Sequence, residues 1–136
     1  MEEVDLLTIF NTVIRPTLEY AVPTYHPMML NQEMAEDFEQ IQKRASKLIF
    51  GWHSSYDEVI SSGKMETLDS RRENLTKKFA LKTSKNKRFG SWFREKDYGT
   101  LNLRSKKKFE EDYARTERMR KSPVYYMQRI LNENVN

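Results

Sequence analysis

Apolar residues recur at helical spacing over most of the 136-residue chain. Between Glu3 and Val22 they fall on one side of a helix when each residue turns by about 100°. This stripe contains Val4, Leu7, Phe10, Ile14, Leu18, Ala21 and Val22. Pro16 lies inside the stretch, where it lacks an N–H and its ring presses on the carbonyl of Thr12, so we expect the helix to kink or to start again there. Pro23 and Pro27 are expected to end it, with Tyr25 and His26 in a packed corner rather than a ligand site.

A second helix is predicted from Asn31, a good N-cap, to Gly51, a good residue after a helix end. Its predicted buried stripe is Met34, Phe38, Ile41, Ala45, Leu48 and Ile49. Acidic residues fill its first half and basic residues its second, which complements the helix dipole without any partner. Gln40, Arg44 and Lys47 nevertheless project from one side, where Arg44 and Lys47 could contact a phosphate backbone.

Two further helices are expected before residue 90. Ser55 and Glu58 form a capping box that opens a short helix closed by Gly63. Thr67 then caps a long helix that is expected to run to about Asn86. Its aligned apolar residues are Leu68, Leu75 and Phe79.

A row of cations follows one flank of that long helix. Its members, all candidate nucleic-acid contacts, are Arg71, Lys78, Lys82 and Lys85. Cations on a ridge match the regular spacing of phosphates, although such a row is more often simply a solvated helix face. Phe89, Trp92 and Phe93 come next, and packing under the helix is more typical of such a cluster than base stacking.

Helical periodicity fades from Arg94 to Ser122, which predicts an extended basic arm with Phe109 and Tyr113 as anchors. The candidate phosphate contacts in this arm are Arg104, Lys106, Lys107, Lys108, Arg115, Arg118, Arg120 and Lys121. An arm of this length is also compatible with disorder in the absence of a partner.

The last predicted helix begins after Ser122, with Pro123 at its first position. Its apolar face is Val124, Met127, Ile130 and Leu131. The sequence therefore predicts an all-α fold, a small helical bundle with a basic arm and a C-terminal helix. We expect a helical domain over residues 1–93, and the arm with the last helix over 94–136.

Charge is distributed unevenly along the chain. Residues 1–70 hold 5 Lys or Arg against 12 Asp or Glu, whereas residues 71–136 hold 19 against 8. The formal charges are thus −7 and +11, which sum to the net +4. A strongly basic half attracts polyanions. The alternative is that the acidic half folds against the basic half and neutralises it.

Residue types exclude several chemistries. The chain has no Cys and only two His, which disfavours disulfides and zinc, and no catalytic carboxylate pair, nucleophile triad or glycine-rich phosphate loop is present. We therefore expect no enzyme activity, metal or cofactor. No apolar run could cross a membrane and the start of the chain is acidic, so we expect an intracellular protein, nuclear or cytoplasmic, without membrane contact.

Several short stretches match one known family in the same order along the chain. They are Ile14-Arg15-Pro16, Leu18-Glu19-Tyr20-Ala21, Tyr25-His26-Pro27, Ile41-Gln42-Lys43-Arg44-Ala45, Leu68, Arg71-Arg72-Glu73, Phe79-Ala80, Arg88-Phe89, Trp92-Phe93, Asn102-Leu103-Arg104-Ser105, Arg115-Thr116 and Lys121-Ser122-Pro123. With these residues the chain resembles the region after the palm in reverse transcriptases of jockey-type non-LTR retrotransposons. Trp52, His53 and Tyr125 depart from the family pattern at the joints.

The resemblance implies a helical thumb and C-terminal tail, which in RNA-directed DNA polymerases closes over template RNA and the growing DNA strand. The fingers and palm have no counterpart here, so the resemblance implies a non-catalytic module that contacts the backbone of RNA or of an RNA/DNA duplex. The alternative is an exapted helical adaptor or structural subunit whose arm and last helix wrap an acidic protein partner.

Overall fold

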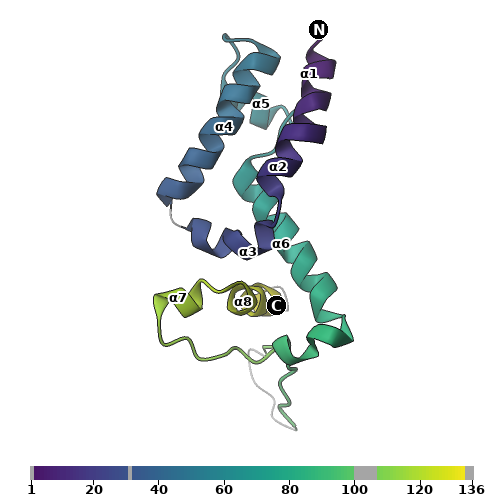
Figure 1. Cartoon of the computed structure of the whole chain (residues 1–136), viewed down its shortest axis with the longest axis vertical. Coiled ribbons are helices and arrows are strands. Elements are labelled where there is room, and N and C mark those ends of the chain that lie inside the picture. The colour runs from purple at the N-terminus through teal and green to yellow at the C-terminus, as the bar shows by residue number, and fades with distance from the viewer. Residues whose placement is uncertain (1, 31, 100–106, 134–136) are drawn as a thin grey trace. The chain divides into compact units, whose positions relative to one another are not determined.

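The computed structural model describes residues 2–30, 32–99 and 107–133, and its regular structure is helical (Figure 1). The elements are α1 (Glu3–Ile9), the π-helical η1 (Phe10–Ile14), α2 (Arg15–Glu19), α3 (Val22–Tyr25), the 3₁₀ helix η2 (His26–Leu30), α4 (Gln32–Phe50), α5 (Tyr56–Ser61), α6 (Leu68–Ser84), the 3₁₀ helix η3 (Lys87–Trp92), α7 (Glu117–Arg120) and α8 (Pro123–Glu133). Within the described residues the β pairing is one isolated bridge, between Glu95 and Phe109. The predicted all-α class is therefore confirmed. None of the described helices combines the length and apolar character needed to cross a membrane.

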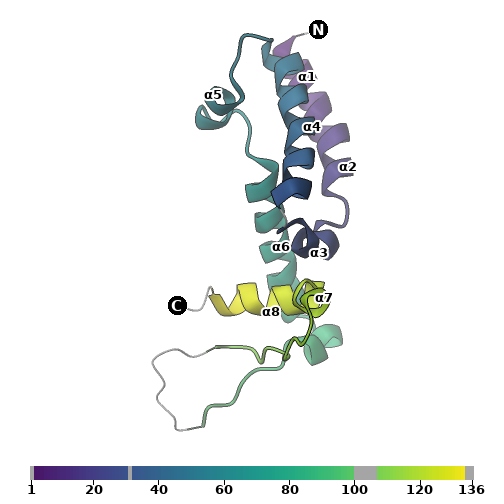
Figure 2. The same ribbon diagram turned by 90° about the vertical axis from the view of Figure 1, so that its left-hand side faces the viewer.

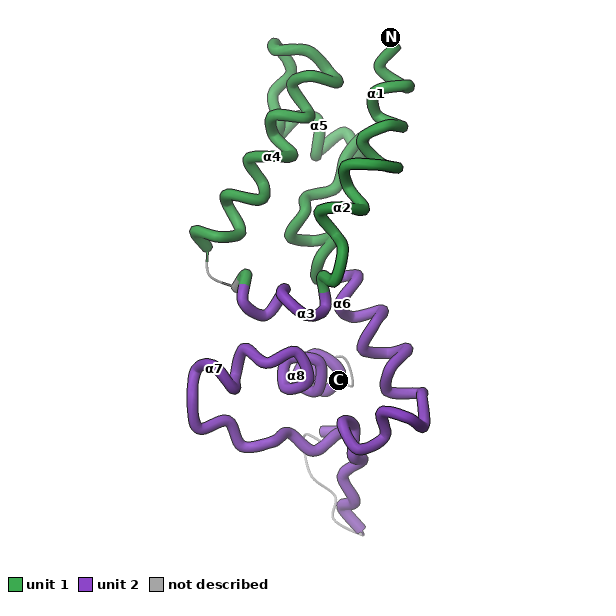
Figure 3. The backbone as a smooth tube through the Cα atoms, viewed as in Figure 1, with its two compact units in different colours: residues 1–22, 29–73 green, residues 23–28, 74–136 purple. Residues whose placement is uncertain are grey.

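The chain folds into two compact units (Figure 3). Unit 1 contains residues 1–22 and 29–73, and unit 2 contains residues 23–28 and 74–136. Helix α6 belongs to unit 1 up to Glu73 and to unit 2 from Asn74 onwards. This division falls elsewhere than the boundary expected after residue 93, because the second half of α6 packs with the C-terminal segment.

The N-terminal helix is interrupted close to Pro16, as its sequence predicts. Across the π turn the N–H of Arg15 bonds to the carbonyl of Phe10, and α2 then starts with Pro16 in its first turn. Since a π turn holds an extra residue, the apolar stripe changes phase there. Phe10 is buried, whereas Val4, Ile14 and Ala21 are exposed, so the single predicted stripe was wrong for these three residues.

Unit 1 has a core of Phe10, Val59 and Met65. Side chains from α1, α4 and α5 pack against it: Leu7, Ala45, Ile49, Phe50 and Ile60. Figures 1 and 2 show α1 running alongside α4. The predicted capping box of α5 is confirmed, with the N–H of Ser55 donating to the Glu58 carboxylate at 3.3 Å.

Helix α4 buries a polar face that its sequence did not predict. Gln42 and Ser46 are its buried residues, while Met34, Ile41 and Leu48 of the predicted stripe are exposed. The Gln42 amide donates to the carbonyl of Glu66 at 2.7 Å, so a polar side chain can be buried without losing its hydrogen bonds. The expected N-cap, Asn31, lies outside the described residues.

The structure also corrects the predicted buried face of helix α6. The hydroxyl of Thr67 accepts from the N–H of Ser70 at 3.3 Å, which confirms the predicted cap. Phe79, however, is exposed rather than aligned with the core. The buried residues of the helix are Leu68, Arg72, Thr76, Ala80 and Thr83. Hydrophobicity alone does not identify this face, because most of its members are small or polar.

Unit 2 has its own core, made of Ala80, Phe93, Phe109, Met127 and Leu131. The rings of Phe93 and Phe109 meet edge to face with centroids 5.7 Å apart. Helix α8 begins at Pro123 as predicted. In the same unit the ring of His26 is buried against Tyr126, with Nε2 3.1 Å from the tyrosine hydroxyl oxygen, as in a packed corner.

Candidate nucleic-acid interface

The two compact units carry opposite charge. Unit 1 contains 7 Lys or Arg and 13 Asp or Glu, and unit 2 contains 17 and 7, so their formal charges are −6 and +10. The charge separation seen along the sequence is therefore also a separation between two folded units. Unit 2 is the part of the molecule suited to a polyanion.

The basic arm of unit 2 is held in place by a buried side chain of α8. Asn132 accepts a hydrogen bond from the N–H of Phe109 at 2.8 Å and donates to its carbonyl at 3.0 Å. The same amide group donates to Glu111 at 3.0 Å. Phe109 is thus an anchor, as predicted, whereas Tyr113 is exposed and the prediction that it anchors the arm was wrong. Ala114 is the buried residue beside it.

A second amide, one turn earlier on α8, holds the chain just before the arm and again within it. Gln128 is buried and donates to the carbonyl of Trp92 at 2.7 Å. Its Oε1 accepts from the N–H of Asp112 at 3.4 Å. Between these points residues 94–96 pair with 108–110, where the N–H of Glu110 donates to the carbonyl of Arg94 at 2.8 Å. The described parts of the arm therefore lie in fixed positions along α8.

Most carboxylates of unit 2 form ion pairs with neighbouring cations. Lys107 pairs with Glu111 at 2.9 Å, and Lys108 with Glu95 at 3.8 Å. Further pairs are Arg94 with Asp112 at 3.9 Å, Arg120 with Glu117 at 3.9 Å, and Arg129 with Glu133 at 3.3 Å.

These contacts shift two pKa values. The hydrogen bond to Glu111 raises the pKa of Lys107. Partial burial raises the pKa of Glu111, but the hydrogen bonds from Asn132 and Lys107 outweigh it and leave that pKa below its ordinary value.

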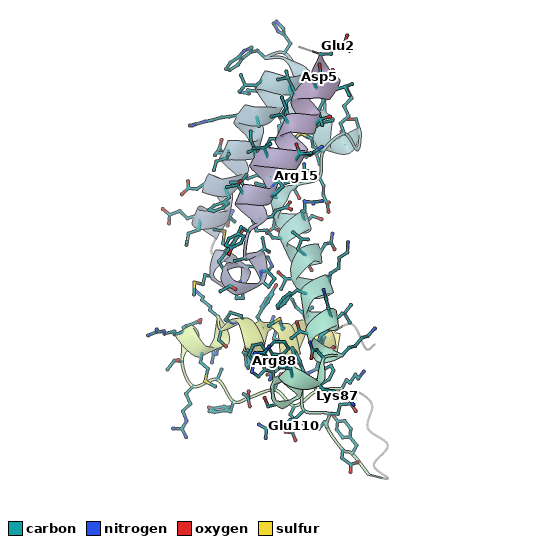
Figure 4. All side chains as sticks on the ribbon, turned by 45° about the vertical axis from the view of Figure 1, so that its right-hand side comes forward. Glu2, Asp5, Arg15, Lys87, Arg88 and Glu110 are labelled. Carbon is teal, nitrogen blue, oxygen red and sulfur yellow. The ribbon has the colours of Figure 1, made fainter. Side chains whose placement is uncertain are left out.

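Nine further cations of unit 2 have no carboxylate partner among the described residues. They are Lys78, Lys82, Lys85, Lys87, Arg88, Lys96, Arg115, Arg118 and Lys121, and apart from the half-buried Lys121 they are exposed. Figure 4 shows Lys87 and Arg88 on η3, with Glu110 on the arm of the same unit. These side chains leave positive charge uncompensated on the surface of unit 2, and together we call them the basic surface of unit 2.

The structure brings two of the sequence-predicted contacts together. Lys85, in the turn after α6, and Lys108 of the arm line one hollow of about 640 Å³ in unit 2, beside Leu81 and Phe109. Arg104 and Lys106 of the arm lie outside the described residues. Lys87, Arg88 and Lys96 were not among the candidates, although their position next to the cationic helix and before the arm could have identified them.

The candidates of unit 1 have different surroundings. Arg44 and Lys47 line a hollow of about 690 Å³ with Lys43, Trp52 and Tyr56, so the shared side expected for Arg44 and Lys47 is present. Lys47 Nζ lies 5.8 Å from the centroid of the Trp52 ring.

Arg71, the third candidate in unit 1, is held by carboxylates. It forms an ion pair with Glu19, through two hydrogen bonds of which one measures 3.2 Å, and its guanidinium lies 4.0 Å from Glu66. The hydrogen bond to Glu19 raises the pKa of Arg71. Its charge is compensated within unit 1.

No cluster of His, Asp or Glu that could hold a metal ion occurs in the described parts of the chain. The chemistry available to the basic surface is therefore that of ammonium and guanidinium groups, which bind anionic oxygens by charge and hydrogen bonds. No protein-family model, curated protein or solved structure matches this chain.

Proposed function

We propose that this protein is a non-catalytic nucleic-acid-binding module that contacts the phosphate backbone of RNA, or of an RNA/DNA duplex, through the basic surface of unit 2. The observation that carries the proposal is the charge of +10 on one folded unit, together with exposed cations that no described carboxylate neutralises. A nucleic acid supplies the missing negative charges and releases condensed counterions when it binds.

The position of the cations supports backbone contact rather than base readout. Lys78 and Lys82 lie one turn apart near the end of α6, and Lys85 follows directly after the helix. Flexible lysine side chains recognise phosphates as point charges. Base readout requires planar groups that donate in pairs to a base edge in a groove. We therefore propose weak sequence preference and strong salt dependence.

The resemblance to the thumb of jockey-type reverse transcriptases agrees with this role, since a thumb contacts the template and product strands. In this proposal the chain binds but does not polymerise, because the sequence contains no counterpart of the palm carboxylates. A module of this kind acts inside the cell, in the nucleus or the cytoplasm.

Fluorescence anisotropy with a labelled RNA/DNA hybrid, over a series of salt concentrations, tests the proposal. We expect the logarithm of the binding constant to fall linearly with the logarithm of salt concentration, with a slope of about −0.9 per neutralised phosphate as for duplex DNA. Replacing Lys78, Lys82 and Lys85 by Gln is expected to weaken binding at low salt and to make the slope shallower by up to about three of these increments.

A matched control removes the same number of charges from unit 1, by Lys43→Gln, Lys47→Gln and Lys64→Gln. We expect a smaller effect from this control. An equal loss in both variants would exclude unit 2 as the principal contact surface. Absence of binding at low salt would reject the function, and recovery of a stoichiometric acidic protein without nucleic acid would favour the adaptor.

A further inference from the structure

Helix α4 carries an exposed apolar row that unit 1 leaves uncovered. Met34, Ile41 and Leu48 are 46%, 43% and 67% exposed. They are spaced seven residues apart, so neighbouring members lie about 20° apart around the helix and all three fall within about 40°. Gln42 and Ser46, about 100° and 140° further round the helix from Ile41, face the interior of the unit. The row is therefore an apolar seam on the outside of a 19-residue helix.

The charges beside this seam reverse in sign at its middle. Asp37 and Arg44 lie next to the seam on the same flank, before and after Ile41. Glu33 and Lys47 lie further round on that flank, again before and after Ile41. Asp37 and Arg44 are offset from Ile41 by four and three residues, about 6 Å and 4.5 Å along the helix axis. A helix that runs in the opposite direction with Ile41 at its centre presents this pattern reversed.

We propose that α4 pairs with α4 of a second copy of this chain, antiparallel and around a two-fold axis that passes beside Ile41. This two-fold axis places each flank of α4 against the same flank of the partner's α4, with the two helices running in opposite directions. Ile41 packs on its own counterpart, and Met34 packs on the partner's Leu48. Asp37 then faces the partner's Arg44, and Glu33 the partner's Lys47, so both kinds of pair occur twice.

Charge selects this orientation over the parallel one. In a parallel pair with the same seam, each flank of α4 would meet the opposite flank of the partner helix, which holds Ala45 and Ile49 packed on the core, so Asp37 and Arg44 would find no opposite charge there. Seven-residue spacing is the repeat with which two helices pack side by side over several turns. The apolar row supplies the attraction, and the flanking charges set the direction and register.

This inference does not depend on the proposed function. The seam belongs to α4 of unit 1, whereas the basic surface belongs to unit 2, and the two are tested by different measurements. In the dimer, Arg44 and Lys47 bind carboxylates of the partner copy rather than phosphates.

Sedimentation equilibrium of the full chain over a range of concentrations tests the dimer directly. We expect the wild type to approach twice the monomer mass of 16.3 kDa as concentration rises. Ile41→Glu places two carboxylates at the two-fold axis and is expected to give a monomer at every concentration. A monomeric wild type at high concentration, or an Ile41→Glu variant that still dimerises, would overturn the proposal. Far-UV circular dichroism verifies that the variant keeps its helices, and Ile41→Ser provides a second, uncharged disruption if Ile41→Glu fails to fold.

A charge exchange tests the direction and register. Asp37→Arg alone, or Arg44→Asp alone, opposes like charges at two places in the dimer and is expected to weaken dimerisation on the order of tenfold. The double variant, Asp37→Arg with Arg44→Asp, restores opposite pairs and is expected to recover most of the affinity. Glu36→Arg makes the same charge change on the same helix away from the seam and serves as the matched control. Equal effects of Glu36→Arg and Asp37→Arg, or a double variant no better than the single ones, would rule out this register.

Discussion

The side-chain amide of Gln42 donates a hydrogen bond to the hydroxyl of Tyr56 at 2.9 Å, inside unit 1. The same hydroxyl donates to the carboxylate of Glu39, so three polar side chains from α4 and α5 form one chain of hydrogen bonds. Glu39 also accepts from the N–H of Leu68 at 3.1 Å, at the start of α6. A short polar network therefore ties three helices of unit 1 together where a purely apolar core would have been expected.

The network makes the ionisation of Tyr56 unfavourable. Burial first, and then the hydrogen bond to Glu39, raise the pKa of Tyr56 above its ordinary value of 10.0. Since the folded-state pKa is raised, this contribution to stability is complete below about pH 10 and is lost as the pH rises toward the folded-state pKa. We expect the native wild type and Tyr56→Phe to show the same increase in tyrosinate absorbance up to about pH 11.

Unfolded samples provide the control for that titration. In denaturant the variant is expected to give a smaller absorbance increase than the wild type, because it has six tyrosines instead of seven. If the native wild type already titrates one tyrosine more than Tyr56→Phe, the hydroxyl is not shielded as described.

Asn132→Ala tests how the arm is held on α8. The change leaves the buried N–H and carbonyl of Phe109 without their partner, and each unsatisfied buried group costs about 1–3 kcal/mol. We expect the free energy of unfolding to fall by about 3 kcal/mol in urea denaturation, with faster amide exchange at Phe109. Asn11→Ala, at an exposed position in η1, is expected to change stability by less than about 0.5 kcal/mol. Similar values for the two variants would contradict the role of Asn132 in holding the arm.

The two aromatic residues of the arm are expected to differ strongly when truncated. Phe109 is 5% exposed and packs on Phe93, whereas Tyr113 is 82% exposed. Phe109→Ala is therefore expected to destabilise unit 2 by about 3–5 kcal/mol, and Tyr113→Ala by less than about 0.5 kcal/mol, as measured by chemical denaturation. A large effect of Tyr113→Ala would mean that the arm packs differently.

Acid is expected to weaken the attachment of the arm through Glu111. The pKa of Glu111 is lowered from 4.5 by its hydrogen bonds to Asn132 and Lys107, against the effect of burial. A lowered carboxyl pKa stabilises the fold above about pH 4.5, and this contribution is lost as the pH falls through the folded-state value. Glu111→Gln should lower stability at pH 7 by about 1 kcal/mol and by less at pH 3, in urea titrations at both pH values.

Glu110→Gln is the charge-matched control for that experiment. Its side chain is exposed and makes no hydrogen bond with a described residue. We expect the stability of Glu110→Gln to differ between pH 7 and pH 3 by the same amount as that of the wild type. A Glu111→Gln variant that loses as much stability at pH 3 as at pH 7 would point to packing instead of charge.

Local signals in the sequence were sufficient to predict the starts of α5, α6 and α8 and the break near Pro16. They were not sufficient at Pro23 and Pro27, which were expected to end the first helix but lie inside α3 and η2, or for α7, which lies in the predicted extended arm. The caps at Ser55 and Thr67 act over three or four residues, and the missing N–H of Pro16 acts within one turn, so neither depends on the rest of the fold. The all-α class followed from the same patterns. Many of the cations of unit 2 could also be identified in advance, because the strongly basic character of the second half of the chain is visible in the sequence.

Only the tertiary structure decided which side of each long helix is buried. Helix α4 turns Gln42 inward and leaves Leu48 exposed, because the amide meets the carbonyl of Glu66, a residue 24 positions away. Polar burial of this kind depends on partners that are distant in sequence, and helical periodicity contains no information about them. The same reason applies to Asn132 and to the ion pair of Arg71 with Glu19. The sequence by itself determined where helices form and how charge is divided, whereas the fold decided which polar groups are paired inside and which cations remain available.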